Sequence, residues 1–127
     1  MYCGIDIIEV DRIKKACKNI EFIDKIYTKK EYQSLKDIKS DMKYQKLAGK
    51  FAGKEAIYKA VSKICIENNV NIFFNEIEIL NIDELKGRPE VNILNKDCEN
   101  LLNEYIIDIS ISHIKDTATA ICILNKK

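Results

Sequence analysis

Two acidic side chains stand where a carboxylate is costly unless something compensates for its charge. Asp6 lies in an apolar stretch that is typical of a strand, with Ile8 and Val10 on its own face. Glu55 lies in a long helical pattern, at the margin between an apolar stripe and a track of alanines, and Lys59 follows at i+4. A carboxylate beside ammonium groups at a buried boundary could hold Mg²⁺ and a pyrophosphate together.

Each of these residues also has a simpler interpretation. A lone aspartate in a strand more often lies at a strand edge or caps a turn, and Glu55 with Lys59 could be an ordinary surface pair worth about 0.3–0.5 kcal/mol. Lys54, however, points near the centre of the apolar stripe, so the helix has little fully exposed face to spare. That pattern favours a buried charged site.

The N-terminal elements must carry Asp6 and a group of basic residues. Residues 2–10 are dense in β-branched side chains and predict a strand. Apolar residues then recur at helical spacing from Val10 to Ile20, which predicts one amphipathic helix. Thr28 and Glu31 have the spacing of a capping box and mark a second, short helix that runs toward Ile38, before a polar loop over residues 36–43.

The element that carries Glu55 is the longest helical pattern, from about residue 43 to 64. Its apolar stripe consists of Leu47, Phe51, Tyr58, Val61 and Cys65. A second track has small side chains at i+4 spacing: Ala48, Ala52, Ala56 and Ala60. Because small side chains permit close packing, this helix is expected to be buried on two sides.

The C-terminal half changes to a β pattern. Strands are predicted over residues 72–80 and 90–94, joined through a Gly-Pro turn at 86–89. A helix over 95–103 and a final hairpin of 105–112 with 117–124 complete the chain. We therefore predict the α+β class, with one domain over residues 1–127 and an antiparallel sheet packed on the long central helix.

The composition limits the classes of function. Apolar residues make up 46% and charged residues 32% of the chain, which fits a single folded domain. Charges interrupt every apolar run and the first residues do not resemble a signal peptide, so we expect a cytoplasmic protein without membrane contact. The five cysteines are scattered, without a C-x-x-C pair, which favours reduced and mostly buried thiols over disulfides or a zinc site.

Basic residues gather near the N-terminus although the net charge is only +1. Arg12, Lys14, Lys15 and Lys18 are expected to face outward from the first helix. A solvated basic face is the commoner explanation of such a run, and a docking site for an anionic partner is the alternative. A nearly neutral chain is not expected to coat nucleic acid.

Four segments together resemble the small holo-(acyl carrier protein) synthases, a class of 4'-phosphopantetheinyl transferases. Residues 4–13 (GIDIIEVDRI) resemble the opening motif of the family, and residues 51–60 (FAGKEAIYKA) resemble its F-x-x-K-E-A-x-x-K-A helix. Residues 87–89 (GRP) resemble its G-x-P turn, and residues 110–113 (SISH), with Ala118 and Ala120, resemble its closing hairpin. The segments follow in family order across almost the whole chain.

The resemblance implies that the chain transfers 4'-phosphopantetheine from coenzyme A to a serine of apo-acyl carrier protein and releases 3',5'-ADP. Asp6 and Glu55 would be the Mg²⁺ ligands, and Lys54 and Lys59 would neutralise charge on the pyrophosphate. Asp6, Glu55 and Lys59 are thus the expected catalytic residues. The serine proton could pass to Glu55, to Asp6 or to a metal-bound water.

Coenzyme A contacts are also implied by the resemblance, from Lys54, Lys59, Gly87, Pro89, Ser112 and His113. His113, the only histidine, could instead be a structural residue at the end of a strand. The family usually has a glycine-containing turn after its K-A helix, whereas Val61 to Glu67 contain no glycine. The pose of coenzyme A is therefore expected to differ here if that turn contacts a phosphate.

The resemblance finally implies two kinds of protein partner. Acidic acyl carrier protein would dock on Arg12, Lys14, Lys15 and Lys18, with Arg12 as the best single candidate. A chain of this length would supply half of a cleft and form a homotrimer with interfacial sites. Two other functions remain open: modification of carrier domains of secondary metabolism, and a non-catalytic module that binds an acidic partner. The joint presence of Asp6, Glu55, Lys54 and Lys59 speaks against the latter.

Overall fold

The computed structural model of the protein describes residues 1–82 and 86–127 and has the predicted α+β class. The helices are α1 (Val10–Ala16), α2 (Ile20–Ile26), α3 (Lys29–Gln33), α4 (Met42–Glu67) and α5 (Lys96–Leu102), with a 3-10 turn η1 (Phe74–Glu76). The strands are β1 (Tyr2–Glu9), β2 (Ile77–Ile82), β3 (Arg88–Ile93), β4 (Tyr105–His113) and β5 (Thr117–Lys126).

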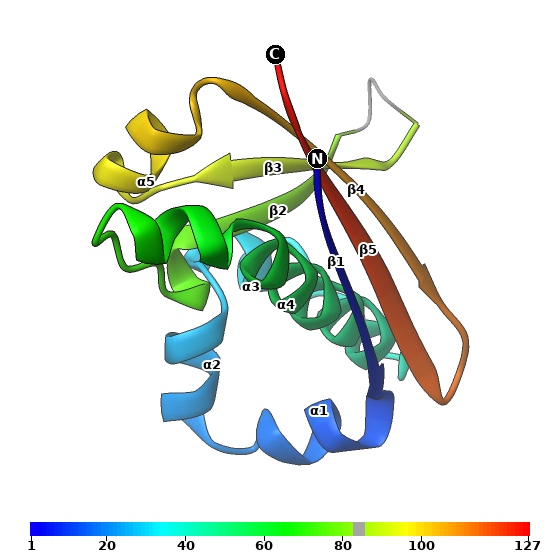
Figure 1. Ribbon diagram of the computed structural model, residues 1–127. Coiled ribbons are helices and arrows are strands. Elements are labelled where there is room, and N and C mark those ends of the chain that lie inside the picture. The colour runs from blue at the N-terminus through cyan, green and yellow to red at the C-terminus, as the bar shows by residue number, and fades with distance from the viewer. Residues whose placement is uncertain (83–85) are drawn as a thin grey trace.

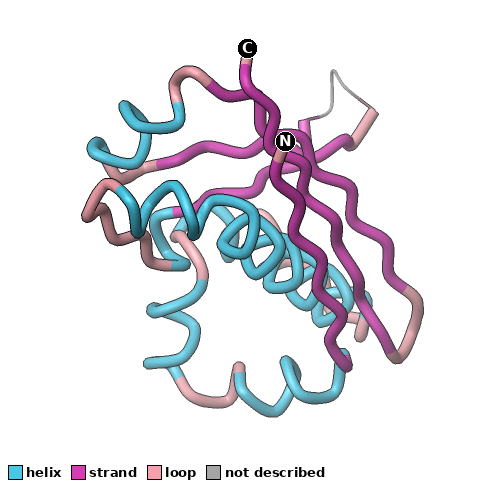
Figure 2. Tube along the Cα trace, in the orientation of Figure 1, coloured by secondary structure: helices cyan, strands magenta, loops and turns pink. Residues whose placement is uncertain are grey.

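The long helix α4 lies against an antiparallel sheet. The order of the three-stranded sheet is β1-β5-β4, so the last strand of the chain lies between the first strand and its own hairpin partner. A second antiparallel sheet consists of β2 and β3. Figure 1 shows α4 crossing the inner face of the larger sheet, and Figure 2 shows the helical N-terminal region below it. The expected packing of an antiparallel sheet on a central helix is confirmed.

The alanine track of α4 is where the first strand comes closest. Its four alanines are at most 1% exposed. A Cβ atom on Gly4 would lie 1.9 Å from the backbone oxygen of Ala56, so only glycine permits this approach of β1 to the helix backbone. Asp6, two residues further along β1, lies on the same face and is thereby brought to α4.

The outer face of the larger sheet is apolar and exposed. Ile5 and Ile7 of β1 are 62% and 70% exposed, and Ile121 and Ile123 of β5 are each 39% exposed. Ile5 pairs with Ile121 in the register of β1 with β5. A sheet face that is left to solvent normally alternates to polar residues, so this face is typical of an interaction surface.

Several boundaries differ from the sequence prediction, among them the end of the second short helix, which was expected to run toward Ile38 but stops at Gln33. The expected single helix from Val10 to Ile20 is broken, because α1 ends at Ala16 and α2 begins at Ile20 with Asn19 accepting a hydrogen bond from Glu21 N. The strand expected from residue 72 begins at Ile77, after η1. The predicted capping box at Thr28 and Glu31 is present at the start of α3.

Candidate active site

Asp6 and the C-terminal half of α4 form a charged cluster at the inner face of the sheet. Lys59 Nζ lies 3.4 Å from Asp6 Oδ1 and donates a hydrogen bond to Ile5 O at 2.9 Å. The Asp6 side chain is 17% exposed, whereas Lys59 is half exposed. The lysine therefore joins α4 to the free edge of β1 and places its charge beside a largely buried carboxylate.

Glu55 belongs to the same cluster through its electrostatics. Partial burial raises the pKa of Glu55, the charge of Asp6 raises it further, and the Lys59 ammonium lowers it. The two carboxylates are thus close enough to repel each other. The ion pair of Lys59 is with Asp6, so the simpler interpretation of an isolated Glu55–Lys59 surface pair does not describe this region. The structure brings together Asp6, Glu55 and Lys59.

The donor set of this cluster fits a magnesium ion whose coordination shell is completed by oxygen atoms of the substrate. Mg²⁺ in enzymes is commonly bound through one or two carboxylates, with waters and phosphate oxygens as the other ligands. Within residues 1–82 and 86–127, no group of three or more His, Cys, Asp or Glu side chains is placed to hold a metal ion. Asp6 and Glu55 repel each other, and a bound cation would relieve this repulsion. The pair therefore matches a site that waters and substrate complete, and not a structural site whose ligands all come from the protein.

Lys54 lies elsewhere, in the protein core. Its side chain is 0% exposed, and Nζ lies 2.7 Å from Glu31 Oε1. Nζ also donates hydrogen bonds to Phe74 O at 2.8 Å and to Ile77 O at 2.5 Å. This arrangement differs from the expected contact with a pyrophosphate, because the ammonium is enclosed by protein groups. Lys54 instead ties α3, η1 and the start of β2 to α4.

A separate cavity of about 440 Å³ gathers several of the residues that were expected to contact coenzyme A. Gly87, Pro89 and His113 line it. His113 Nδ1 lies 2.9 Å from Gln45 Oε1 near the start of α4. Ser112 is exposed and points to the opposite face of β4, because neighbouring residues of a strand alternate. The structure thus brings His113 together with the Gly-Pro turn and does not bring Ser112 with them.

Two lysines of this cavity were missed by the sequence analysis. Lys46 and Lys50 line it, and Lys50 is only 6% exposed and donates a hydrogen bond to Ile79 O at 2.6 Å. Burial lowers the pKa of Lys50 to about 8, against the opposing effect of Glu31. A signal was available, since Lys46, Lys50 and Lys54 follow each other at i+4 on the same side of the helix.

The two groups of candidate residues occupy different parts of α4. Gln45, which holds His113, and Glu55 are ten residues apart, which corresponds to about 15 Å along the helix axis. The residues lining the 440 Å³ cavity do not include Asp6, Glu55 or Lys59. The chain therefore presents a carboxylate cluster and a basic cavity as two distinct surfaces.

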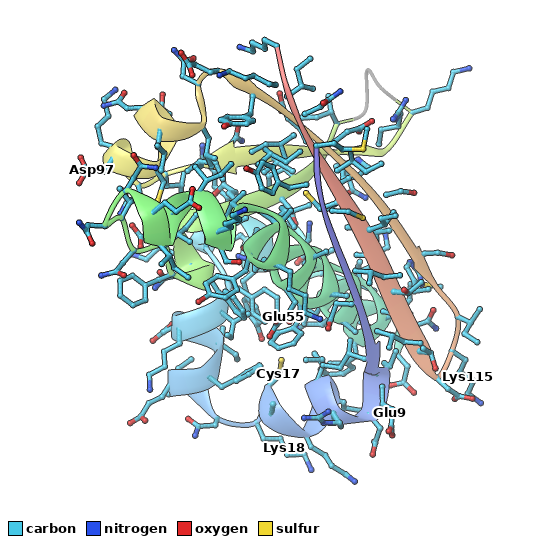
Figure 3. All side chains as sticks on the ribbon, viewed as in Figure 1. Glu9, Cys17, Lys18, Glu55, Asp97 and Lys115 are labelled. Carbon is cyan, nitrogen blue, oxygen red and sulfur yellow. The ribbon has the colours of Figure 1, made fainter. Side chains whose placement is uncertain are left out.

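A groove of about 810 Å³ begins beside Glu55 and follows one side of α4. Tyr58, Ser62 and Cys65 continue its lining along the helix, and Phe74 of η1 also lines it. Phe74 packs edge-on against Tyr58. Figure 3 shows Glu55 on the side of α4 that faces the N-terminal helices, from which α2 contributes to the lining.

The basic residues expected to dock a partner are all exposed. Arg12, Lys14 and Lys15 lie on α1, and Lys18 follows its end and points away from the protein in Figure 3. Two of them have acidic neighbours: Lys14 lies 3.1 Å from Asp41, and Lys15 lies 2.8 Å from Asp11. Their charge is therefore partly balanced within the chain.

Among the helices that the structure describes, none has the length and apolar composition needed to span a membrane.

The chain is similar in sequence to proteins of one known family. A sequence model of the 4'-phosphopantetheinyl transferase superfamily matches residues 2–122. The holo-[acyl-carrier-protein] synthase of Geobacillus sp. (strain WCH70) is 38% identical over 124 residues, which cover 97% of this chain and 94% of that protein. The protein of the same name from Fusobacterium nucleatum is 40% identical over 124 residues and covers 95% of each chain.

The fold is similar to that of a solved structure with a bound ligand. The crystal structure of a holo-(acyl-carrier-protein) synthase from Bacillus anthracis str. Ames, in complex with CoA (3',5'-ADP), superposes with a TM-score of 0.77 and 32% sequence identity. The match covers 99% of this chain and 96% of that one. The similarity in fold therefore extends over nearly the whole chain.

Proposed function

This chain belongs to the 4'-phosphopantetheinyl transferase superfamily, and from that membership we propose that it is a holo-[acyl-carrier-protein] synthase. It transfers 4'-phosphopantetheine from coenzyme A to a serine of apo-acyl carrier protein and releases 3',5'-ADP. The observation that carries the proposal is the meeting of Asp6, Glu55 and Lys59 in a chain that matches synthases over nearly its full length. We further propose that the reaction serves fatty acid biosynthesis and takes place in the cytoplasm.

Asp6 and Glu55 are the residues that would hold Mg²⁺. When bound there, the ion would supply Lewis-acid stabilisation to the phosphate oxygens of coenzyme A. Lys59 Nζ, which is half exposed beside Asp6, is placed to neutralise negative charge on the pyrophosphate as the bond to 3',5'-ADP breaks. The two carboxylates and the lysine would thus position the phosphorus atom that the carrier serine attacks.

The serine hydroxyl must lose its proton during the attack. Glu55 is the better placed of the two carboxylates to accept it, because partial burial and the charge of Asp6 raise the pKa of Glu55. Asp6 Oδ1 is instead paired with the Lys59 ammonium at 3.4 Å. We therefore assign Glu55 as the proton acceptor.

Coenzyme A is proposed to be held by the basic cavity as well as by the carboxylate cluster. Gly87, Pro89 and His113 line that cavity, and Lys46 and Lys50 add positive charge for its phosphates. Lys54 acts on the site indirectly, through the wall that it fixes at Phe74. Ser112 faces the exposed side of β4, where it could reach only a ligand or subunit that lies on the outer face of the sheet.

A homotrimer explains both the divided site and the apolar sheet face. A second subunit on the outer face of β1 and β5 would cover Ile5, Ile7, Ile121 and Ile123. Within one subunit, the basic cavity and the carboxylate cluster are about 15 Å apart along α4. In the trimer, the basic cavity of one subunit would lie beside the carboxylate cluster of the next. We propose three such interfacial sites in a closed cyclic assembly.

The acyl carrier protein is proposed to dock on α1. Arg12, Lys14, Lys15 and Lys18 are exposed and form a basic surface for an acidic partner. Arg12 and Lys18 are the stronger candidates, because Lys14 and Lys15 already contact Asp41 and Asp11. Docking through such charges weakens as the salt concentration rises.

The test is to incubate the protein with apo-acyl carrier protein, coenzyme A and Mg²⁺ and to weigh the carrier by mass spectrometry. We expect the carrier to gain the mass of one phosphopantetheine, and to gain nothing when Mg²⁺ is chelated. A carrier whose serine is replaced by alanine is the matched control. An unchanged mass of the intact carrier, with a folded protein and with Mg²⁺ present, would contradict the proposed transfer and favour a non-catalytic binding module.

A further inference from the structure

Lys50 carries an amine at the wall of the basic cavity. The residue is 6% exposed, and it lines the cavity of about 440 Å³ together with Lys46 and Gly49. Lys50 Nζ donates a hydrogen bond to Ile79 O at 2.6 Å, which fixes the end of the side chain against β2. The function proposed above uses the charge of this side chain and leaves its nucleophilic character unused.

The surroundings of Lys50 disfavour its ammonium form. Burial removes water from the charge, and Lys46 and Lys54 repel it from one helical turn on either side. The acceptor of its hydrogen bond is a neutral carbonyl. The carboxylate of Glu31 is already engaged, because Oε1 lies 2.7 Å from Lys54 Nζ and Oε2 accepts a hydrogen bond from Ile79 N.

The pKa of Lys50 follows from these surroundings. The charged and titratable groups that face it come from α3, α4, β2 and β4: Glu31, Lys46, Lys54, Glu78 and His113. Burial has the largest effect and lowers the pKa of Lys50 to about 8, since the two carboxylates offset only part of it. At pH 7, about one Lys50 side chain in ten is therefore a neutral amine, against fewer than about one in a thousand for a lysine of ordinary pKa.

The cavity selects the reagents that reach this amine. Lys46 lines the same cavity and supplies a positive charge that attracts a phosphate group. A volume of about 440 Å³ is within the range of sites for small molecules. Desolvated lysines and lysines beside other cations are the ones that form imines with carbonyl compounds in enzymes.

We propose that Lys50 is a modification site that forms an imine with small phosphorylated aldehydes that enter the basic cavity. The phosphate group is held by Lys46, and the neutral amine of Lys50 attacks the aldehyde carbon. A C=N bond forms, and the carbonyl oxygen leaves as water with the two amine hydrogens. The step needs no oxidant or reductant, and hydrolysis of the imine reverses it.

The test incubates the intact wild-type protein with pyridoxal 5'-phosphate, reduces any imine with sodium borohydride and maps the labelled lysines after trypsin digestion. Trypsin does not cleave after a modified lysine, so label on Lys50 gives the peptide of residues 47–54. We expect this peptide to carry most of the label. Its initial rate of formation should rise about eightfold from pH 7 to pH 8.5, whereas a lysine of ordinary pKa would show a rise of about 30-fold.

Three controls accompany this measurement. Pyridoxal has the same aldehyde without the phosphate and should label Lys50 at least about tenfold more slowly. Lys50→Arg keeps the positive charge without a primary amine and should not be labelled at this position. Lys59 is half exposed, and the peptide of residues 55–63 reports its label. Equal label on Lys59 and Lys50, equal rates with the two reagents, or a 30-fold rise at Lys50 would each overturn the proposal.

These measurements do not depend on the proposed function, whereas protection by coenzyme A does. If coenzyme A occupies the basic cavity, it should prevent the labelling of Lys50. Label that is unchanged in the presence of coenzyme A would contradict that part of the proposed function and leave the imine site in place.

Discussion

At the scale of single residues, the carboxylate pair determines both chemistry and stability. Asp6 and Glu55 are held on the same side of the sheet, where partial burial and the charge of Asp6 raise the pKa of Glu55. Such repulsion is tolerated because Lys59 lies beside Asp6, and a divalent cation would relieve the rest. The site is therefore expected to lower the stability of the metal-free protein slightly while making it ready for a cation and a phosphate.

The first prediction concerns Glu55→Gln, which should lower kcat/KM by about 10²-fold or more because a metal ligand and proton acceptor is lost. The folded state raises the pKa of Glu55 above its ordinary value of 4.5, so it binds this proton more tightly than the unfolded chain. The contribution of Glu55 to the stability of the wild type is thus fully present below that ordinary value and is lost as the pH rises through the folded pKa.

In metal-free protein at pH 7, Glu55→Gln should consequently melt at the same temperature as the wild type or higher, as measured by differential scanning calorimetry. Glu67→Gln, at the exposed end of the same helix, is the matched control and should change neither activity nor Tm. Wild-type turnover in Glu55→Gln would remove this residue from the mechanism.

The second prediction separates two lysines of the same motif. Lys54→Met leaves the buried Glu31 carboxylate without its ion-pair partner and should destabilise the protein by about 3–5 kcal/mol. Lys59→Met removes a half-exposed pair and should cost about 1 kcal/mol or less, yet it should lower kcat by at least about tenfold. Urea denaturation and steady-state kinetics measure both effects. Similar stability losses in the two variants would contradict the assignment.

The buried Lys54 and the half-exposed Lys59 show how far the sequence could predict the site. Asp6, Glu55 and Lys59 could be selected because a strand face and a helix margin constrain their positions. The position of Lys54 in the apolar stripe indicated its burial, but its ion-pair partner could not be predicted. That partner is Glu31, which caps α3 by accepting from Thr28 N and also accepts from Ile79 N of a distant strand. Nothing in the local sequence indicates that a capping glutamate also forms a buried ion pair.

At the scale of elements, a boundary was predicted wrongly where the signal of a single capping residue competes with a periodic apolar pattern. The apolar spacing from Val10 to Ile20 continues through a break, and only the capping side chain of Asn19 marks the new helix. The long helix was predictable because its two tracks extend over many turns. The break matters for function, because it ends α1 before Lys18 and turns α2 toward the groove.

The third prediction belongs to α1. Arg12→Glu should raise the KM for acyl carrier protein by about tenfold or more and leave the KM for coenzyme A nearly unchanged, because a reversed charge repels an acidic partner at the docking surface. Lys96→Glu, an equal charge change on the exposed surface of α5, is the control. Initial rates at two salt concentrations measure the effect, which should shrink at high salt. Equal changes in both KM values would argue against docking on α1.

At the scale of the whole molecule, the sheet order decides what the protein exposes. The central position of β5 could not be derived from the hairpin signal, since pairing of the first and last strands is a long-range contact. That pairing aligns isoleucines of β1 and β5 on the outer face. The sequence pattern predicted the strands and their alternation, but the joint apolar surface emerges only from their order.

The fourth prediction tests this surface. Ile7→Lys should convert a homotrimer into monomers, because it places a charge in the proposed interface, and activity should fall with the loss of the interfacial sites. Ile114→Lys is the control, since Ile114 is 67% exposed in the connection between β4 and β5. Sedimentation velocity measures the mass of both variants. A wild-type protein that sediments as an active monomer would refute the interfacial site.

The isoleucines on the outer face of β1 and β5 have a consequence for how activity scales with the amount of protein. If folded monomers are inactive until three of them meet, the fraction of working enzyme depends on a third-order equilibrium. Halving the concentration near the dissociation midpoint then removes more than half of the activity. A cell that makes this chain would therefore have a threshold of synthesis, below which its carrier proteins remain unmodified although folded chain is present.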